Sequence, residues 1–77
     1  MCKGDQIKLL RAGFRIIRSE DSSGTPRIKE LLFHTDGKLG VNFVSQADWY
    51  LLEKFPTKAA RDRAMAKLLE DDHVISD

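Results

Sequence analysis

A chain of 77 residues has room for one domain with a single core and no separate substrate domain, so residues 1–77 are expected to form one unit. Its composition, 42% hydrophobic and 32% charged, is that of a folded domain, since a disordered chain has fewer apolar residues and a larger net charge. Thirteen basic against 12 acidic residues give a net charge of +1, which counts against a dedicated nucleic-acid domain but leaves room for a local basic patch.

The cysteine content and the hydropathy of the chain indicate where it resides. Cys2 is the only cysteine, so no intramolecular disulfide can form, whereas small secreted domains usually carry several. No apolar run reaches the ~18 residues that a membrane helix needs, and residues 1–5 do not open a signal peptide. We therefore expect a cytoplasmic protein that does not associate with membranes.

The first elements in chain order are a short helix and a strand. Asp5 can cap a helix over residues 5–12, and Gly13 can end it. Residues 14–19 alternate in the manner of a strand, with apolar side chains on both faces. The polar, turn-rich stretch 20–26 then separates this strand from the next element.

The segment 27–34 permits two interpretations. Pro26 stands at the first position of a possible helix, whereas the Asp36-Gly37 pair that follows is a strong signal for a β-hairpin. We favour a strand for residues 27–34, with residues 39–44 as the strand that returns. A helix over the same segment stays open as the alternative.

The last strand and the last helix have the clearest signals. Residues 46–48 have the composition of a second turn, and residues 49–55 that of a strand. Pro56 stops this strand, and Thr57 can cap a helix over residues 58–71, whose apolar side chains recur along one side. The order of elements predicts an α+β fold, a small antiparallel sheet of three to four strands packed with a C-terminal helix and a short N-terminal helix.

Both faces of the expected sheet carry apolar side chains, and one long helix can cover only one of them. The second face is covered by the short N-terminal helix, by a second copy of the chain or by a partner, because a large apolar patch is rarely left open on a monomer. The candidate partner or dimer face consists of Leu31, Phe33, Tyr50 and Leu52.

Basic residues gather near the start of the last helix and acidic residues at its end. The helix dipole favours the reverse arrangement, by about 0.3–1 kcal/mol per charge. Backbone N–H groups at a helix N-terminus, surrounded by basic side chains, form an anion site. The alternative is a solvated charged face, with the stem of Arg61 lying over the sheet. The candidate anion or nucleic-acid site consists of Lys54, Lys58, Arg61 and Arg63.

Motifs for catalysis, for phosphate-cradling glycine loops and for paired metal ligands do not occur in the sequence. Residues 70–72 and His73 place oxygen and nitrogen ligands together at the end of the last helix. A structural zinc site uses four Cys or His ligands, and a solvated helix end explains this cluster better. We therefore predict no catalytic residue, no metal site and no cofactor.

Four segments of the chain carry a resemblance: residues 12–18, 25–29, 53–65 and 68–72. Together they resemble a group of short uncharacterised bacterial proteins found in gut anaerobes and their mobile elements. The resemblance covers most of the chain except residues 36–48. It implies a strand over 27–34 and a terminal helix, and it implies no activity and no site.

Two hypotheses for function follow. The leading one is a small non-catalytic binding, adaptor or inhibitor module that acts through protein–protein contacts with an unknown protein or with a second copy of itself. The alternative is nucleic-acid binding, in which the basic N-terminal end of the last helix contacts the phosphate backbone.

Overall fold

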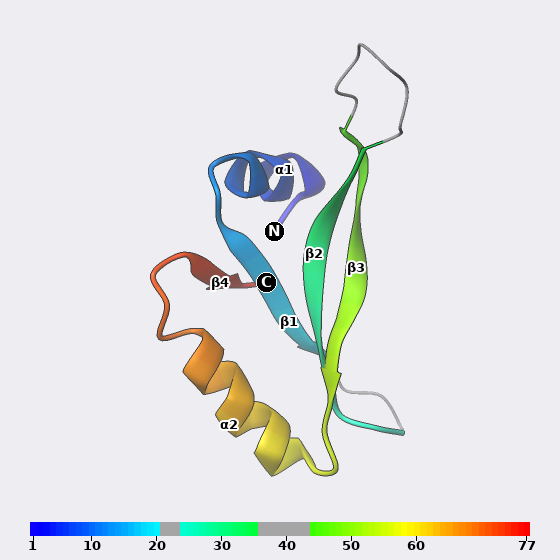
Figure 1. Ribbon diagram of the computed structural model, residues 1–77, viewed down its shortest axis with the longest axis vertical. Coiled ribbons are helices and arrows are strands. Elements are labelled where there is room, and N and C mark those ends of the chain that lie inside the picture. The colour runs from blue at the N-terminus through cyan, green and yellow to red at the C-terminus, as the bar shows by residue number, and fades with distance from the viewer. Residues whose placement is uncertain (21–23, 36–43) are drawn as a thin grey trace.

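The chain forms two helices and a four-stranded sheet within the residues that the structure describes. The computed structural model describes residues 1–20, 24–35 and 44–77 (Figure 1). Its elements are α1 (Lys3–Arg11), β1 (Arg15–Glu20), β2 (Arg27–Thr35), β3 (Val44–Lys54), α2 (Lys58–Leu68) and β4 (Val74–Ser76). The expected α+β class, with a small sheet and a C-terminal helix, is confirmed.

The sheet has the strand order β3-β2-β1-β4. β1 pairs with β2, and β2 with β3, in the expected antiparallel direction. β4, which the sequence did not predict, runs parallel to β1 and places Ile75 beside Ile16, so the sheet is mixed rather than antiparallel. Backbone hydrogen bonds from Arg15 N to His73 O (2.7 Å) and from Asp77 N to Ile17 O (2.9 Å) lie at the two ends of this pairing.

Residues 27–34 belong to the strand β2, so the helix alternative for this segment is wrong. The Asp36-Gly37 pair and most of the expected strand 39–44 lie outside the described residues. The strand that pairs with β2 is described from Val44 onward.

The turn expected at residues 46–48 is wrong, because β3 runs through this segment without interruption. Ala47 lies opposite Phe33 in β2 and is only 8% exposed. It belongs to the core beneath α1, together with Ile16 and Leu31. Pairing and burial of Ala47 therefore outweigh the turn preference of its polar neighbours.

The two helices begin and end close to the predicted signals. α1 starts two residues earlier than expected, so Asp5 lies in its first turn and is not the cap. Gly13 follows the helix with φ = +93°, a conformation that glycine adopts without strain. In α2 the Thr57 hydroxyl accepts a hydrogen bond from Ala60 N (3.2 Å), as an N-cap does. The helix ends at Leu68, earlier than expected, and the chain turns into β4.

Two apolar clusters lie on opposite faces of the sheet. Adjacent residues of a strand point to opposite faces, and the neighbours Ile16 and Ile17 enter different clusters. On one face α2 packs against Ile17 and Ile28; on the other α1 packs over Ile16 and Leu31. Of the three ways to cover the second face, the short N-terminal helix therefore accounts for the part around Leu31.

Candidate functional site

The register of the sheet gathers basic side chains on one face, at the end that α1 leaves uncovered (Figure 1). Residues directly opposite each other in antiparallel strands share a face. Arg18 lies opposite Lys29, and Arg27 lies between Glu20 on one side and Lys54 on the other. Trp49 and Leu51 of β3 belong to the same face through their partners in β2. We call this surface the basic face; it consists of Arg18, Glu20, Arg27, Lys29, Trp49, Leu51 and Lys54.

A single carboxylate serves three cations on the basic face. Glu20 lies 2.8 Å from Arg18, 3.3 Å from Arg27 and 3.3 Å from Lys29, measured between the charged nitrogen and oxygen atoms. Burial opposes ionisation of Glu20, but the hydrogen bonds from Lys29 and Arg18 outweigh it and lower the pKa of this carboxyl. Glu20 is therefore ionised at neutral pH and holds the cluster together.

The cations of the basic face nevertheless exceed its acids. Arg18 directly faces Lys29, and Arg27 directly faces Lys54, although like charges opposite each other destabilise a sheet. Among the described residues of β1, β2 and β3, four cations and one carboxylate leave an excess of three positive charges on this face. The carboxylate of Asp77, which follows β4 beside β1, lies 3.5 Å from the amino group of Met1 and accepts a hydrogen bond from Gln6. Such an excess attracts an anionic ligand.

Trp49 provides a flat apolar surface between these charges and the core beneath α1. The guanidinium of Arg18 lies over its ring, 4.3 Å from the ring centroid. The side chain of Arg18 is 36% exposed, and the next side chain of β3 on this face, Leu51, is 48% exposed. Aromatic, guanidinium and leucine side chains thus form a platform, with Lys29 beside Leu51 and Lys54 beyond it along β3.

The opposite face of the sheet has the opposite charge. Arg15, Glu30, Asp48 and Glu53 lie there according to the pairing, giving three carboxylates and one cation. Arg15 donates a hydrogen bond to Glu30 (2.7 Å), and this bond raises the pKa of Arg15. The strand residues of the two faces therefore carry net charges of opposite sign, while α2, which covers this second face, adds four basic residues and one acidic residue.

Of the four residues predicted to form an anion site at the start of α2, Arg61 is buried and the other three are exposed. Arg61 is 7% exposed and donates to the backbone oxygen of Glu20 (3.3 Å) and to Asp62 Oδ1 (2.9 Å). Its guanidinium is part of the packing between α2 and β1 and is not available to a phosphate. Lys58 and Arg63 are exposed on the helix, and Lys54 belongs to the basic face.

The predicted partner or dimer face is divided by the sheet. Leu31 is 1% exposed beneath α1, with Phe33 half-buried on the same side. Tyr50 lies opposite Glu30 and therefore on the other face. Leu52 is an extra residue at the β-bulge where the pairing shifts between Ile28 and Lys29. The four residues do not form one surface.

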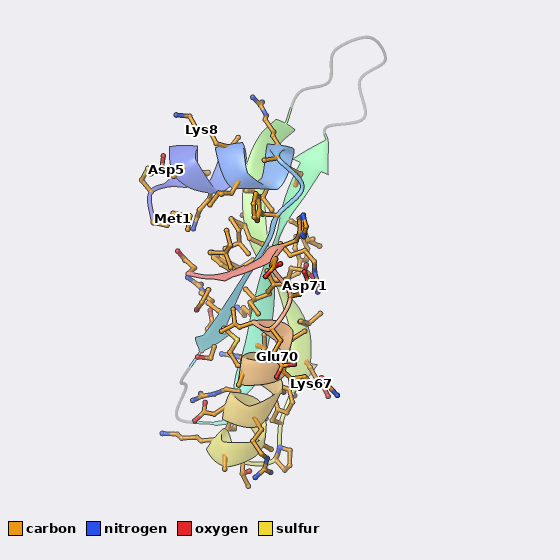
Figure 2. The ribbon with its side chains drawn as sticks, turned by 90° about the vertical axis from the view of Figure 1, so that its left-hand side faces the viewer. Met1, Asp5, Lys8, Lys67, Glu70 and Asp71 are labelled. Atoms are coloured by element: carbon orange, nitrogen blue, oxygen red, sulfur yellow. The ribbon has the colours of Figure 1, made fainter. Side chains whose placement is uncertain are left out.

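A cleft of about 540 Å³ lies between α2 and β3, on the acidic side of the sheet. Apolar side chains and a charged rim of both signs line it. Lys67 and Asp71 of this rim are seen at the C-terminal end of α2 (Figure 2). The lining residues are Arg15, Leu52, Glu53, Ala64, Lys67, Leu68, Asp71 and Val74.

The acidic segment after α2 forms a local turn. Asp71 Oδ1 accepts a hydrogen bond from His73 N (2.9 Å) and lies 3.7 Å from His73 Nδ1. Within residues 1–20, 24–35 and 44–77, no group of three or more His, Cys, Asp or Glu side chains could hold a metal ion. In the same ranges, no helix is both long and apolar enough to cross a membrane.

The spacing of charged residues in the sequence contains a weak signal for the basic face. Arg18 and Glu20 are two residues apart, as are Arg27 and Lys29, so each pair shares a face once the segments are strands. The register in which β2 pairs with β3 could not be predicted from the sequence, because the segment that connects the two strands does not determine it.

Comparison with known proteins yields no relative: no protein-family model, no curated protein and no solved structure matches this chain.

Proposed function

We propose that the protein is a small non-catalytic binding module that binds nucleic acid through the basic face. The observation that carries the proposal is the direct opposition of like charges, Arg18 with Lys29 and Arg27 with Lys54, around a single carboxylate. An arrangement that weakens the free protein is favourable when a ligand supplies the missing negative charge.

Phosphate groups suit this surface better than isolated small anions. The cations come from three adjacent strands, so they form an extended surface and not a closed pocket. Arginine and lysine on such a surface neutralise successive phosphates of a polyanion and release its counterions. The backbone is the same for all base sequences, so this contact supplies affinity without sequence preference.

The location differs from the one that the sequence suggested. The site suggested at the N-terminal end of α2 included Arg61, which is buried and donates a hydrogen bond to Glu20 O. Lys54 is common to both versions, because it lies at the end of β3 beside Arg27. The proposal therefore keeps the class of ligand and moves the site from the helix to the sheet.

A binding titration tests the proposal. Labelled 15-nucleotide strands and 15-base-pair duplexes are titrated at about 50 and about 200 mM salt, and phosphate contacts give an affinity that falls steeply with salt. We expect the Arg27→Gln/Lys29→Gln variant to bind more weakly and to have a salt slope that is smaller by about 1.4–1.8. Lys67→Gln, which removes an exposed charge from α2, is the matched control and should bind like the parent.

Equal binding by the double variant and the parent would exclude the basic face, and no binding of either nucleic acid at about 50 mM salt would exclude the function.

Protein binding through the edge of the sheet is a second candidate. β3 has 11 residues and is the edge strand, and no element of the described chain lies along its outer side (Figure 1). Its consecutive residues Leu51 and Leu52 are 48% and 40% exposed. A long edge strand with exposed apolar residues can pair with a further strand. A second copy of the chain has the same edge strand, so two copies could pair without any other protein.

Light scattering over a range of concentrations tests this candidate. A dimer that becomes monomeric in the Leu51→Lys variant supports pairing of β3 edges. A monomer at every concentration contradicts it.

A further inference from the structure

The basic face contains a feature that phosphate binding alone does not use. Trp49 lies at the border of the core beneath α1, and Arg18 covers its ring at 4.3 Å from the centroid. A surface that served only phosphates would need cations and no aromatic platform. Nucleobases, in contrast, stack on aromatic rings and on the planes of arginine guanidinium groups.

The shape of the surface decides between duplex and single strand. A protein reads a duplex by placing a helix or a β-ribbon in a groove, and the basic face is the flat side of a sheet with no helix over its charged end. The bases of a duplex are turned inward and cannot reach Trp49 or Arg18. Those of a single strand are free to stack while its phosphates meet Lys29 and Lys54.

Resting on the function proposed above, we infer that the ligand is a single-stranded nucleic acid, with one base stacked on the Arg18–Trp49 pair. The base lies against the exposed side of the Arg18 guanidinium, which stays over the indole ring. Leu51 extends the apolar surface for the edge of the base or for its neighbour. Lys29 and Lys54 lie on the side of Trp49 that points away from α1, and they neutralise the phosphates that follow the stacked base.

The chain contains its own reporter for this contact. Trp49 is the only tryptophan, so its fluorescence reports the platform and nothing else. Saturation with an oligothymidylate or an oligouridylate of 15 nucleotides should change the emission of Trp49. A duplex of the same length, at a concentration that saturates the protein, should change it much less.

Two variants separate stacking from charge. Arg18→Lys keeps the positive charge and removes the planar group, so we expect single strands to bind about 5- to 100-fold more weakly. The salt slope should stay the same, because no phosphate contact is lost. Trp49→Leu should have a similar effect on labelled strands, with circular dichroism to check that the variant folds. If Trp49→Leu does not fold, Arg18→Lys and the emission of Trp49 decide the question.

The possible outcomes distinguish this inference from the proposed function. If Arg18→Lys binds single strands like the parent and the emission of Trp49 does not change, stacking is refuted. Loss of affinity in Arg27→Gln/Lys29→Gln would still support phosphate binding. A heparin fragment that binds as tightly as a single strand of equal charge would also overturn stacking, since it has no bases. Stacking would also be refuted if the duplex bound more tightly than the single strand.

Discussion

Arg18 and Lys29 stand directly opposite each other on β1 and β2, and both side chains contact the carboxylate of Glu20. Two cations in this relation repel each other, and the position of Glu20 shows how the free domain limits the repulsion. In the function proposed above, a phosphate would take the place of this carboxylate. On that proposal, Glu20 stabilises the free protein and competes with the ligand for the same cations.

Glu20→Gln should bind nucleic acid several-fold more tightly than the parent at low salt and should have a lower Tm. The substitution removes the competing charge and the ion pairs that Glu20 makes with the three cations. Titration with labelled single strands and thermal unfolding at about 50 and about 200 mM salt measure the two effects, and high salt should reduce both. Glu53→Gln, on the acidic face, is the control. Weaker binding by Glu20→Gln would show that Glu20 does not compete with the ligand.

The contribution of Glu20 to stability should depend on pH. Its pKa in the folded protein is below the ordinary value of 4.5, because hydrogen bonds from Lys29 and Arg18 outweigh burial. A carboxyl whose pKa is lower in the folded than in the unfolded protein stabilises the fold. This stabilisation is fully present above the pKa in the unfolded state and is lost as the pH falls through the pKa in the folded state. The difference in Tm between the parent and Glu20→Gln should therefore be constant near neutral pH and shrink in acid. A difference that grows as the pH falls would contradict this assignment.

Arg61→Met should destabilise the fold without affecting the affinity for nucleic acid. The variant keeps an apolar stem against the sheet and loses the hydrogen bonds to Glu20 O and Asp62. We expect a loss of about 1–3 kcal/mol in the free energy of unfolding, as for other buried hydrogen-bonded groups. Affinity of the folded variant should stay within about twofold of the parent, since the basic face is intact. A strong loss of affinity with normal stability would return the site to α2.

Ile28→Ala should be strongly destabilising. Ile28 is fully buried between β2 and α2, in the cluster that contains Ile17 and Met65. Removing its methyl and methylene groups leaves a cavity and costs about 2–5 kcal/mol, measured by chemical denaturation. Leu52→Ala, at a residue that is 40% exposed, should cost much less. If both variants lost the same free energy of unfolding, the core would not be packed as described.

Alanine substitutions at two glycines should change the free energy of unfolding in opposite directions. Gly13→Ala places a side chain at φ = +93° and should lower the free energy of unfolding by about 1 kcal/mol or more, although no atom lies within 4 Å of the added Cβ. Gly4→Ala lies inside α1 with the same open space and should raise it by about 0.5–1 kcal/mol. Thermal unfolding of both variants measures the contrast. Stabilisation by both would show that Gly13 is not held in this conformation.

Local signals in the sequence predicted the features that depend on few residues. Gly13 ends α1 and Thr57 caps α2, because the backbone conformation at each depends on its own residue and its neighbours. The strand β2 was also predicted, because the Asp36-Gly37 pair that follows it in the sequence is a local signal for a hairpin.

Features that depend on distant contacts were not predictable. The continuation of β3 through Ala47 depends on its pairing with Phe33 and on α1 above it. The basic face depends on the register between three strands, and a shift by one residue would move Lys29 to the other face. The burial of Arg61 depends on Glu20, which is 41 residues away in the chain.

The parallel pairing of β4 with β1 has a consequence for the order in which the domain folds. β1 precedes β2, β3 and α2 in the chain, and β4 follows every other described element. The hairpin of β2 and β3 and the packing of α1 can form early, while one edge of β1 still lacks its neighbour. Closing that edge joins segments separated by nearly the whole chain, and such long-range pairings are slow to form. The sheet therefore cannot be completed on the ribosome before residues 74–76 have been made, and until then β1 offers its unpaired edge to other chains.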